Sequence, residues 1–80
     1  MQELRYSKVK VERLGQIIKE AGITKRKLSK MIGYTSAYVY GIMNRRVDLT
    51  RAFAVKVCQV FPQYDVDWLL DLEKKEKNND

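Results

Sequence analysis

Apolar residues recur at helical spacing along most of this chain, and glycine and proline cut the pattern into short segments. The first apolar stripe runs from Val11 through Leu14 to Ile18, and Gly22 follows as a left-handed stop. Pro62 forbids the continuation of a later segment. No stretch keeps the alternation of period two that a half-buried strand shows. The pattern therefore predicts a compact all-α fold of five short helices, over about residues 8–21, 24–32, 36–44, 50–61 and 66–72.

Polar residues in front of the apolar stripes predict where the helices begin. The expected N-caps are Thr24, Thr35 or Ser36, Thr50, and Asp65 or Asp67. The connections are short, so residues 9–72 are expected to form one domain. Residues 1–8 are expected to form an N-terminal arm. Residues 73–80 hold no apolar side chain, and we expect this charged tail to fray.

The composition removes several classes of function. A chain of 80 residues forms one small domain, and we expect no second oligomerisation or cleavage domain. Histidine is absent and Cys58 is the single cysteine, so a zinc site, a disulfide framework and histidine general-base catalysis have no residues to build on. No glycine-rich phosphate loop or nucleophile–base pair is visible either. We therefore expect no enzymatic activity, no metal and no cofactor.

Charge is distributed unevenly. The chain holds 16 Lys and Arg against 10 Asp and Glu, a formal net charge of +6. Residues 1–46 contribute 11 cations and 3 acidic residues, and residues 47–80 contribute 5 and 7, so the two parts carry +8 and −2. This asymmetry favours a polyanion as the partner on one side of the molecule, and a merely solvated surface is the alternative.

The segment over residues 24–43 has the pattern that two crossing helices require. Leu28 and Ile32 are apolar, and the small Ser29 suits a close helix–helix approach. We expect Met31 to point inward beside them. Gly33 supplies the tight turn, and the apolar positions 39 and 42 fix the next helix so that its outer face is free. This is the pattern of a helix-turn-helix, although any helical hairpin shows part of it.

These motifs resemble the phage-repressor and Cro-type helix-turn-helix family over roughly residues 9–70. The resemblance lies in Arg13-Leu14, Ala21-Gly22-Ile23-Thr24, Leu28-Ser29…Ile32-Gly33, Val39…Ile42, Cys58…Phe61 and Asp67-Trp68-Leu69-Leu70. It implies a five-helix domain of the lambda-repressor-like type, with the helix-turn-helix at helices 2 and 3. It also implies a transcriptional repressor that binds operator DNA as a dimer. The chain departs from the family in Thr24-Lys25-Arg26-Lys27 and Asn44-Arg45-Arg46, which lie on the proposed DNA surface.

Cations at the start of the second helix contradict a local rule, because the helix dipole disfavours positive charge there. Such a conflict is expected at a functional site, where a phosphate would meet both backbone N–H groups and side-chain charges. A tolerated, solvated charge run is the alternative. The residues expected to contact phosphates are Lys25, Arg26, Lys27, Thr35, Arg45 and Arg46.

The third helix is expected to enter the major groove. If Val39 faces the core, Ala37, Gly41 and Asn44 lie nearest the opposite face, with Tyr38 and Tyr40 on its flanks. The small Gly41 would let this face approach the bases, or it would only ease packing. Asn44 would bond an adenine or cap the helix in a left-handed conformation. The base-reading candidates are Ser36, Ala37, Tyr38, Tyr40, Gly41 and Asn44.

The last apolar string, Val66 to Leu72, holds more apolar residues than one short helix face buries. We expect Trp68 and Leu69 in the core, and Leu70 or Leu72 at a homodimer contact on a two-fold operator. The sequence thus predicts a sequence-specific double-stranded DNA-binding regulator, most of all a Cro-like repressor in the bacterial cytoplasm, associated with the nucleoid. The alternative is a small helix-turn-helix module that inhibits or redirects another regulator or RNA polymerase. Nothing indicates a membrane or a small-molecule ligand.

Overall fold

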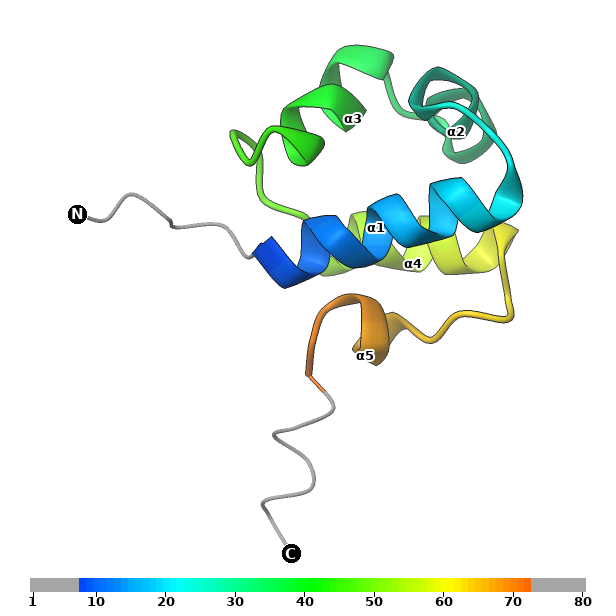
Figure 1. Cartoon of the computed structure of the whole chain (residues 1–80), viewed down its shortest axis with the longest axis vertical. Coiled ribbons are helices and arrows are strands. Elements are labelled where there is room, and N and C mark those ends of the chain that lie inside the picture. Colours follow the sequence, from blue (N-terminus) through cyan, green and yellow to red (C-terminus); the bar gives the residue numbers. More distant parts are fainter. Residues whose placement is uncertain (1–7, 73–80) are drawn as a thin grey trace, which may run out of the picture.

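The computed structural model describes residues 8–72 and forms five helices and no strand within that range (Figure 1). The helices are α1 (Lys8–Ala21), α2 (Lys25–Ile32), α3 (Ser36–Met43), α4 (Arg51–Val60) and α5 (Val66–Leu69). The all-α prediction is confirmed, and the predicted bounds of α1 to α4 are right to within one residue. The predicted arm, apart from Lys8, and the predicted tail lie outside the described residues.

Side-chain caps explain why the helices begin where they do. The hydroxyls of Thr24, Thr35 and Thr50 and the carboxylate of Asp65 each accept a backbone N–H from three residues further on. Thr35 is therefore the N-cap of α3, and Ser36 is its first residue.

The predicted C-terminal end of α5 is wrong, since the helix stops at Leu69 and not at residue 72. Asp71 adopts a left-handed conformation with φ 62°. The N–H of Asp71 donates to the Trp68 carbonyl, and the N–H of Leu72 donates to the Asp67 carbonyl. These bonds close the helix in the way a left-handed C-cap does, although no glycine marks the position.

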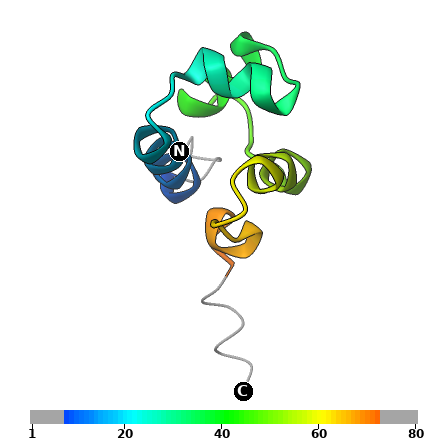
Figure 2. The same ribbon diagram turned by 90° about the vertical axis from the view of Figure 1, so that its right-hand side faces the viewer.

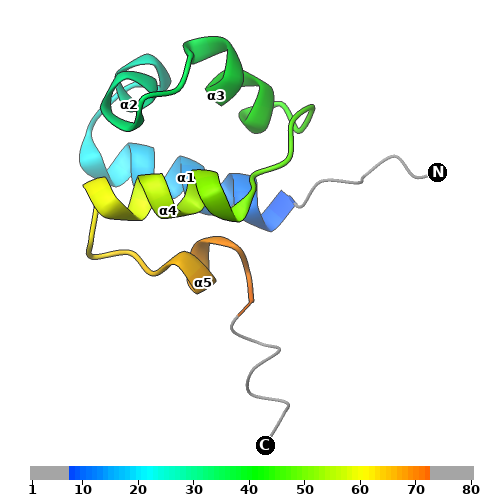
Figure 3. The same cartoon turned by 180° about the vertical axis from the view of Figure 1, so that it is seen from behind.

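The helices form three layers. In Figure 2, α1 and α4 lie side by side, with α2 and α3 on one side of them and α5 on the other. Figure 3 shows the same order from behind: the chain leaves α3 for α4 and then crosses below to α5. The α2–α3 layer packs on α1 and α4, while α5 contacts both α1 and α4 from the opposite side. No described helix is both long and apolar enough to cross a bilayer.

The core lies where these layers meet. Its fully buried members come from all five helices and include Leu14, Leu28, Val39, Phe53 and Leu69. Ile17, beside the predicted stripe of α1, is also fully buried. The prediction that Met31 points inward is wrong, because its side chain is 38% exposed. An eight-residue helix needs to bury little more than the Leu28–Ile32 ridge, and Met31 lies at the edge of that ridge.

Arg13 fastens α5 to α1. Its guanidinium donates to the Trp68 carbonyl and lies 3.5 Å from the Asp71 carboxylate. The same group sits 5.1 Å from the centroid of the Trp68 ring. One half-buried cation therefore satisfies a carbonyl at the end of α5, pairs with a carboxylate and stacks on an aromatic face.

We expect Arg13→Ala to lower the free energy of unfolding by about 2 kcal/mol, since it removes a hydrogen bond to the Trp68 carbonyl, the ion pair of the half-buried Asp71 carboxylate and the contact with the Trp68 ring. Arg51→Ala is the matched control, because the Arg51–Asp67 pair is long, at 4.0 Å, and the Arg51 side chain is 64% exposed. That control should cost less than about 0.5 kcal/mol. Urea unfolding of both variants measures the difference, and equal costs would contradict the role of Arg13.

A second contact joins the C-terminal end of α1 to the segment before α5. The Tyr64 hydroxyl donates to the Glu20 carboxylate, which also accepts from the Gln16 amide at 3.1 Å. The Tyr64 hydrogen bond, and then that of Gln16, lower the pKa of Glu20 below its ordinary value. The bond to Glu20 also raises the pKa of Tyr64.

These two shifts predict a pH window for stability. A lowered carboxylate pKa stabilises the fold above the ordinary pKa of about 4.3, and this stabilisation is lost as the pH falls through the folded value. A raised tyrosine pKa stabilises below about pH 10 and is lost as the pH rises through its folded value. We therefore expect Tyr64→Phe to lower the urea midpoint at neutral pH and to match the parent protein at both extremes. A difference that is the same at every pH would contradict this assignment.

Candidate nucleic-acid interface

The turn between α2 and α3 is built on Ser29 and Gly33. Ser29 is only 2% exposed, and its hydroxyl donates to the Arg26 carbonyl at 2.6 Å. The Ser29 carbonyl accepts the N–H groups of Gly33 at 3.0 Å and Tyr34 at 2.9 Å. Gly33 has φ 81°, a left-handed value that glycine adopts without strain. Ser29 is thus buried where the two helices approach each other, and Gly33 takes the left-handed turn position that the sequence pattern predicts for it.

An aromatic cluster behind α3 corrects one base-reading prediction. The Tyr38 ring lies 5.9 Å from Phe53 of α4 and 4.9 Å from Tyr34, measured between centroids. Tyr34 in turn lies 4.9 Å from Phe53. Tyr38 therefore packs its ring toward the core and does not flank the exposed face of α3. Phe53 supplies an aromatic partner that no local pattern in α3 could reveal.

Gly41 is the second correction. A Cβ atom added at Gly41 would lie 2.8 Å from Cγ2 of Val47, in the chain that follows α3. The Gly41 carbonyl also accepts the N–H groups of Arg46 at 2.8 Å and Val47 at 3.2 Å. This side of Gly41 is therefore covered by the returning chain, and the packing alternative describes it better than a close approach to bases.

Asn44 and Arg45 end α3 in an unexpected way. Asn44 is the C-cap, but its φ of −93° is not left-handed. The left-handed residue is Arg45, with φ 65°. Asn44 is exposed and does not take the left-handed conformation that the capping alternative expected of it, while its contact with an adenine stays a prediction.

The exposed face of α3 is narrower than predicted. It consists of Ala37, Tyr40 and Asn44, which follow one another at i, i+3 and i+7 and form what we call the α3 stripe. Tyr40 is its largest member, with 45% of its surface exposed. Ser36 is half-buried, and the hydroxyl of the exposed Thr35 is engaged as the N-cap at 3.1 Å.

The sequence on both sides of this stripe is rich in cations and contains no acidic residue. Residues 21–47 contain six Lys and Arg and no Asp or Glu, so they account for the whole net charge of +6, and the other residues balance at ten against ten. Lys30, which the sequence reasoning did not select, is one of the six and is exposed on α2. Lys30 could have been identified from the sequence by adding the charges over the two helices of the helix-turn-helix pattern, instead of over each half of the chain.

Of the six cations outside this layer in residues 8–72, four form ion pairs, and Lys19 and Lys56 do not. Lys8, Lys10, Arg13 and Arg51 outside the layer each pair with a carboxylate within 4.0 Å. Within residues 8–72, Arg26, Lys27, Lys30 and Arg46 have no ion pair, and all four are exposed. Helix α5, which contains Asp67 and is flanked by Asp65 and Asp71, lies on the far side of the α1–α4 layer from α2 and α3 (Figure 2). The described residues therefore carry uncompensated positive charge on α2 and in the connection that follows α3.

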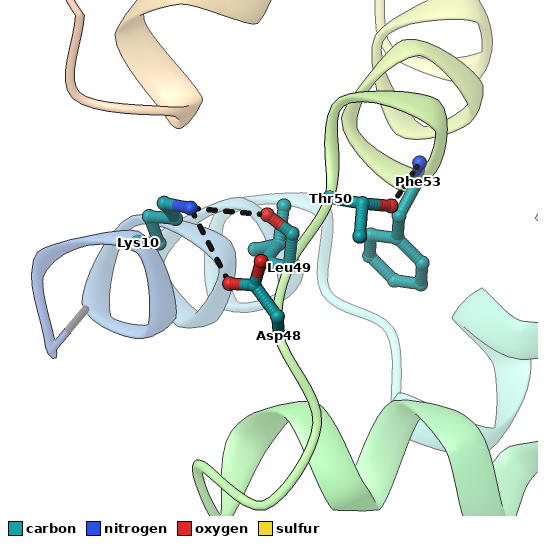
Figure 4. A network of polar contacts seen from close by, with 5 residues as sticks. All are labelled: Lys10, Asp48, Leu49, Thr50 and Phe53. Carbon is teal, nitrogen blue, oxygen red and sulfur yellow. Dashed lines mark hydrogen bonds and ion pairs between the residues drawn. The ribbon is translucent and has the colours of Figure 1, made fainter. Parts of the chain in front are cut away.

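The Arg45–Arg46 connection is held at both ends. At its start, the Gly41 carbonyl binds the N–H groups of residues 46 and 47. At its end, the Lys10 ammonium donates to the Asp48 carboxylate at 3.5 Å and to the Leu49 carbonyl at 3.2 Å (Figure 4). Thr50 then caps α4 by accepting the Phe53 N–H at 3.3 Å (Figure 4). The connection is therefore anchored to α1 and α4 and presents the exposed Arg46 beside the end of α3, whereas Arg45 is half-buried.

The predicted dimer contact at Leu70 is wrong for this fold. Leu70 is 7% exposed and belongs to the core, because the turn at Asp71 folds the end of α5 back onto the domain. Leu72 is half-buried and packs against the same core. Of the two candidates, Leu70 is therefore closed off by the core, and Leu72 keeps a partly exposed side chain.

A comparison of the chain with models of known protein families, with curated proteins and with solved structures finds no match. The functional proposal therefore rests on the geometry and charge of the α2–α3 layer.

Proposed function

We propose that this protein binds double-stranded DNA in a sequence-specific manner through its α2–α3 layer and acts as a transcriptional regulator, as a repressor of the Cro-like kind. The arrangement proposed is the helix-turn-helix of lambda-repressor-like domains. The observation that carries the proposal is the location of the whole net charge in residues 21–47, next to an uncharged exposed stripe on α3. A basic rim around an uncharged helix face suits phosphates on either side of a groove.

In this proposal α3 lies in the major groove, which is wide enough to admit a helix. Ala37 offers a methyl group to thymine, Asn44 offers the amide that pairs with the N6 and N7 edge of adenine, and Tyr40 lies between them. The first turn of α2 presents backbone N–H groups together with Arg26 and Lys27 to one phosphate chain. Arg45 and Arg46 contact phosphates at the other end of α3.

Selection of bound duplexes from random DNA, followed by affinity measurements across salt concentrations, tests this function. We expect a preferred site, and an affinity that falls by about 0.9 log units per log unit of salt for each phosphate contacted. A control duplex of scrambled sequence should bind more weakly with a similar salt slope. Failure to bind any duplex at about 50 mM salt would overturn the proposal.

A protein-interaction module is the second candidate, and the exposed Met31 and Tyr40 favour it. They are the large hydrophobic side chains that stand out from the described surface, at 38% and 45% exposure. Both residue types are enriched at protein interfaces. A complex with a regulator or polymerase whose affinity barely changes with salt would support this function over DNA binding.

Binding as two copies to a two-fold site stays a prediction. Leu70 is buried within the domain, and the half-buried Leu72 stays a candidate for this contact. Sedimentation of the protein with its selected duplex measures the stoichiometry, and one copy on a palindromic site would remove the dimer.

A further inference from the structure

The three cations at the start of α2 are not equivalent. Arg26 and Lys27 are exposed, whereas Lys25 is half-buried. The Lys25 ammonium lies 5.5 Å from the centroid of the Tyr40 ring on α3. This is within the distance at which a cation is attracted to an aromatic face. One cation of the phosphate-binding set thus touches the largest side chain of the α3 stripe.

The contact limits where the Tyr40 ring can lie. Tyr40 is 45% exposed, so packing against the core does not fix its ring alone. An exposed aromatic ring has several rotamers available, and a cation on one face favours the rotamer that keeps the contact. Lys25 is also the cation that the dipole of α2 disfavours at its first position, and the ring offsets part of that cost.

We infer that Lys25 is a positioning residue for sequence recognition: by holding the Tyr40 ring, it couples the phosphate contacts of α2 to base reading by α3. This inference rests on the proposed function. In this inference Lys25 differs in role from Arg26 and Lys27, which contact only phosphates. Lys25 therefore governs which sequences are preferred, in addition to how tightly all sequences bind.

The test compares Lys25→Gln with Arg26→Gln, two variants that remove one charge each from adjacent positions. Both should lower the salt slope by about one unit. Arg26→Gln should weaken the selected duplex and its single-mismatch variants by the same factor. Lys25→Gln should in addition reduce the ratio between selected and mismatched duplexes at least three-fold.

Variants of the ring show whether the extra effect passes through Tyr40. In a Tyr40→Leu background, Lys25→Gln should lose its effect on the ratio and behave like Arg26→Gln. Lys25→Arg should keep the ratio, because a guanidinium also stacks on an aromatic ring. Tyr40→Phe should keep the dependence on Lys25, since the ring and not the hydroxyl makes the contact.

A measurement without DNA checks the contact itself. The ε-methylene protons of Lys25 should show an upfield ring-current shift that disappears in Tyr40→Leu. Absence of that shift, or equal effects of Lys25→Gln and Arg26→Gln on the ratio, would overturn the inference while DNA binding stands. Absence of binding to every duplex by the parent protein would instead overturn the proposed function, and the inference with it.

Discussion

Replacing Lys27 and Arg46 together by Gln should lower the affinity for the selected duplex roughly 50-fold at 0.1 M salt, and should lower the salt slope by about two units. Both side chains are exposed, and neither has an ion pair within residues 8–72. Lys27 lies in the first turn of α2 and Arg46 in the connection after α3, so each is expected to contact a different phosphate. Loss of both removes two sites of counterion release. Fluorescence anisotropy across salt concentrations measures both quantities.

A second double variant, which removes two charges from outside the α2–α3 layer, distinguishes the effect of where the charges lie from the effect of total net charge. Lys19 on α1 and Lys56 on α4 are also exposed, and their replacement by Gln removes the same two charges outside the α2–α3 layer. We expect this control to change the affinity by less than about three-fold, since distant exposed charges are largely screened at 0.1 M salt. Equal losses for both pairs would mean that the protein attracts DNA only through its total charge.

Gly41→Ala should lower the free energy of unfolding by about 1–2 kcal/mol. Alanine in a helix interior ordinarily gains about 1 kcal/mol over glycine, so the expected sign is opposite to that of helix propensity. The reason is the 2.8 Å separation between an added Cβ and Cγ2 of Val47. Relief of the clash would displace the chain that carries Arg45 and Arg46, so DNA affinity should fall as well. Urea unfolding and DNA titration measure the two effects.

Val47→Ala supplies the rescue for this variant. Truncating Val47 removes the clashing Cγ2 and leaves its Cβ at 3.6 Å from the added atom. The double variant should therefore be more stable than the sum of the two single changes predicts, by more than about 1 kcal/mol. A Gly41→Ala protein that is more stable than the parent would show that the connection moves without cost. That result would contradict the proposed role of the contact between Gly41 and Val47 in placing Arg45 and Arg46.

The helix boundaries were predictable because their signals are local. A threonine or aspartate that caps a helix acts on N–H groups two or three residues away, and a glycine that ends one acts at its own φ angle. Thr24, Thr50 and Gly33 therefore identified their ends from sequence alone. The C-terminal end of α5 could not be predicted in this way, because Asp71, and not a glycine, takes the left-handed conformation there.

The details of the candidate site depend on partners distant in sequence. Tyr38 turns inward because Phe53 of α4 receives its ring, and Gly41 is covered because Val47 returns over it. The pairing of Lys25 with Tyr40 likewise joins residues on two helices. A helical wheel centred on Val39 shows only which residues of α3 share a face. It cannot show contacts between α3 and other parts of the chain, so these details could not be predicted from it. The set of phosphate-binding candidates was easier to predict, because exposed charge follows from composition.

The central claim is that the α2–α3 layer is the surface that meets DNA. Backbone amide shifts of the full chain, recorded during titration with the selected duplex, test it most directly. We expect the largest shift changes in residues 24–27 and 36–46, and we expect the shifts of α5 to change no more than they do with salt alone. Largest changes centred on α5 and on the end of α1 that contacts Tyr64 would contradict it.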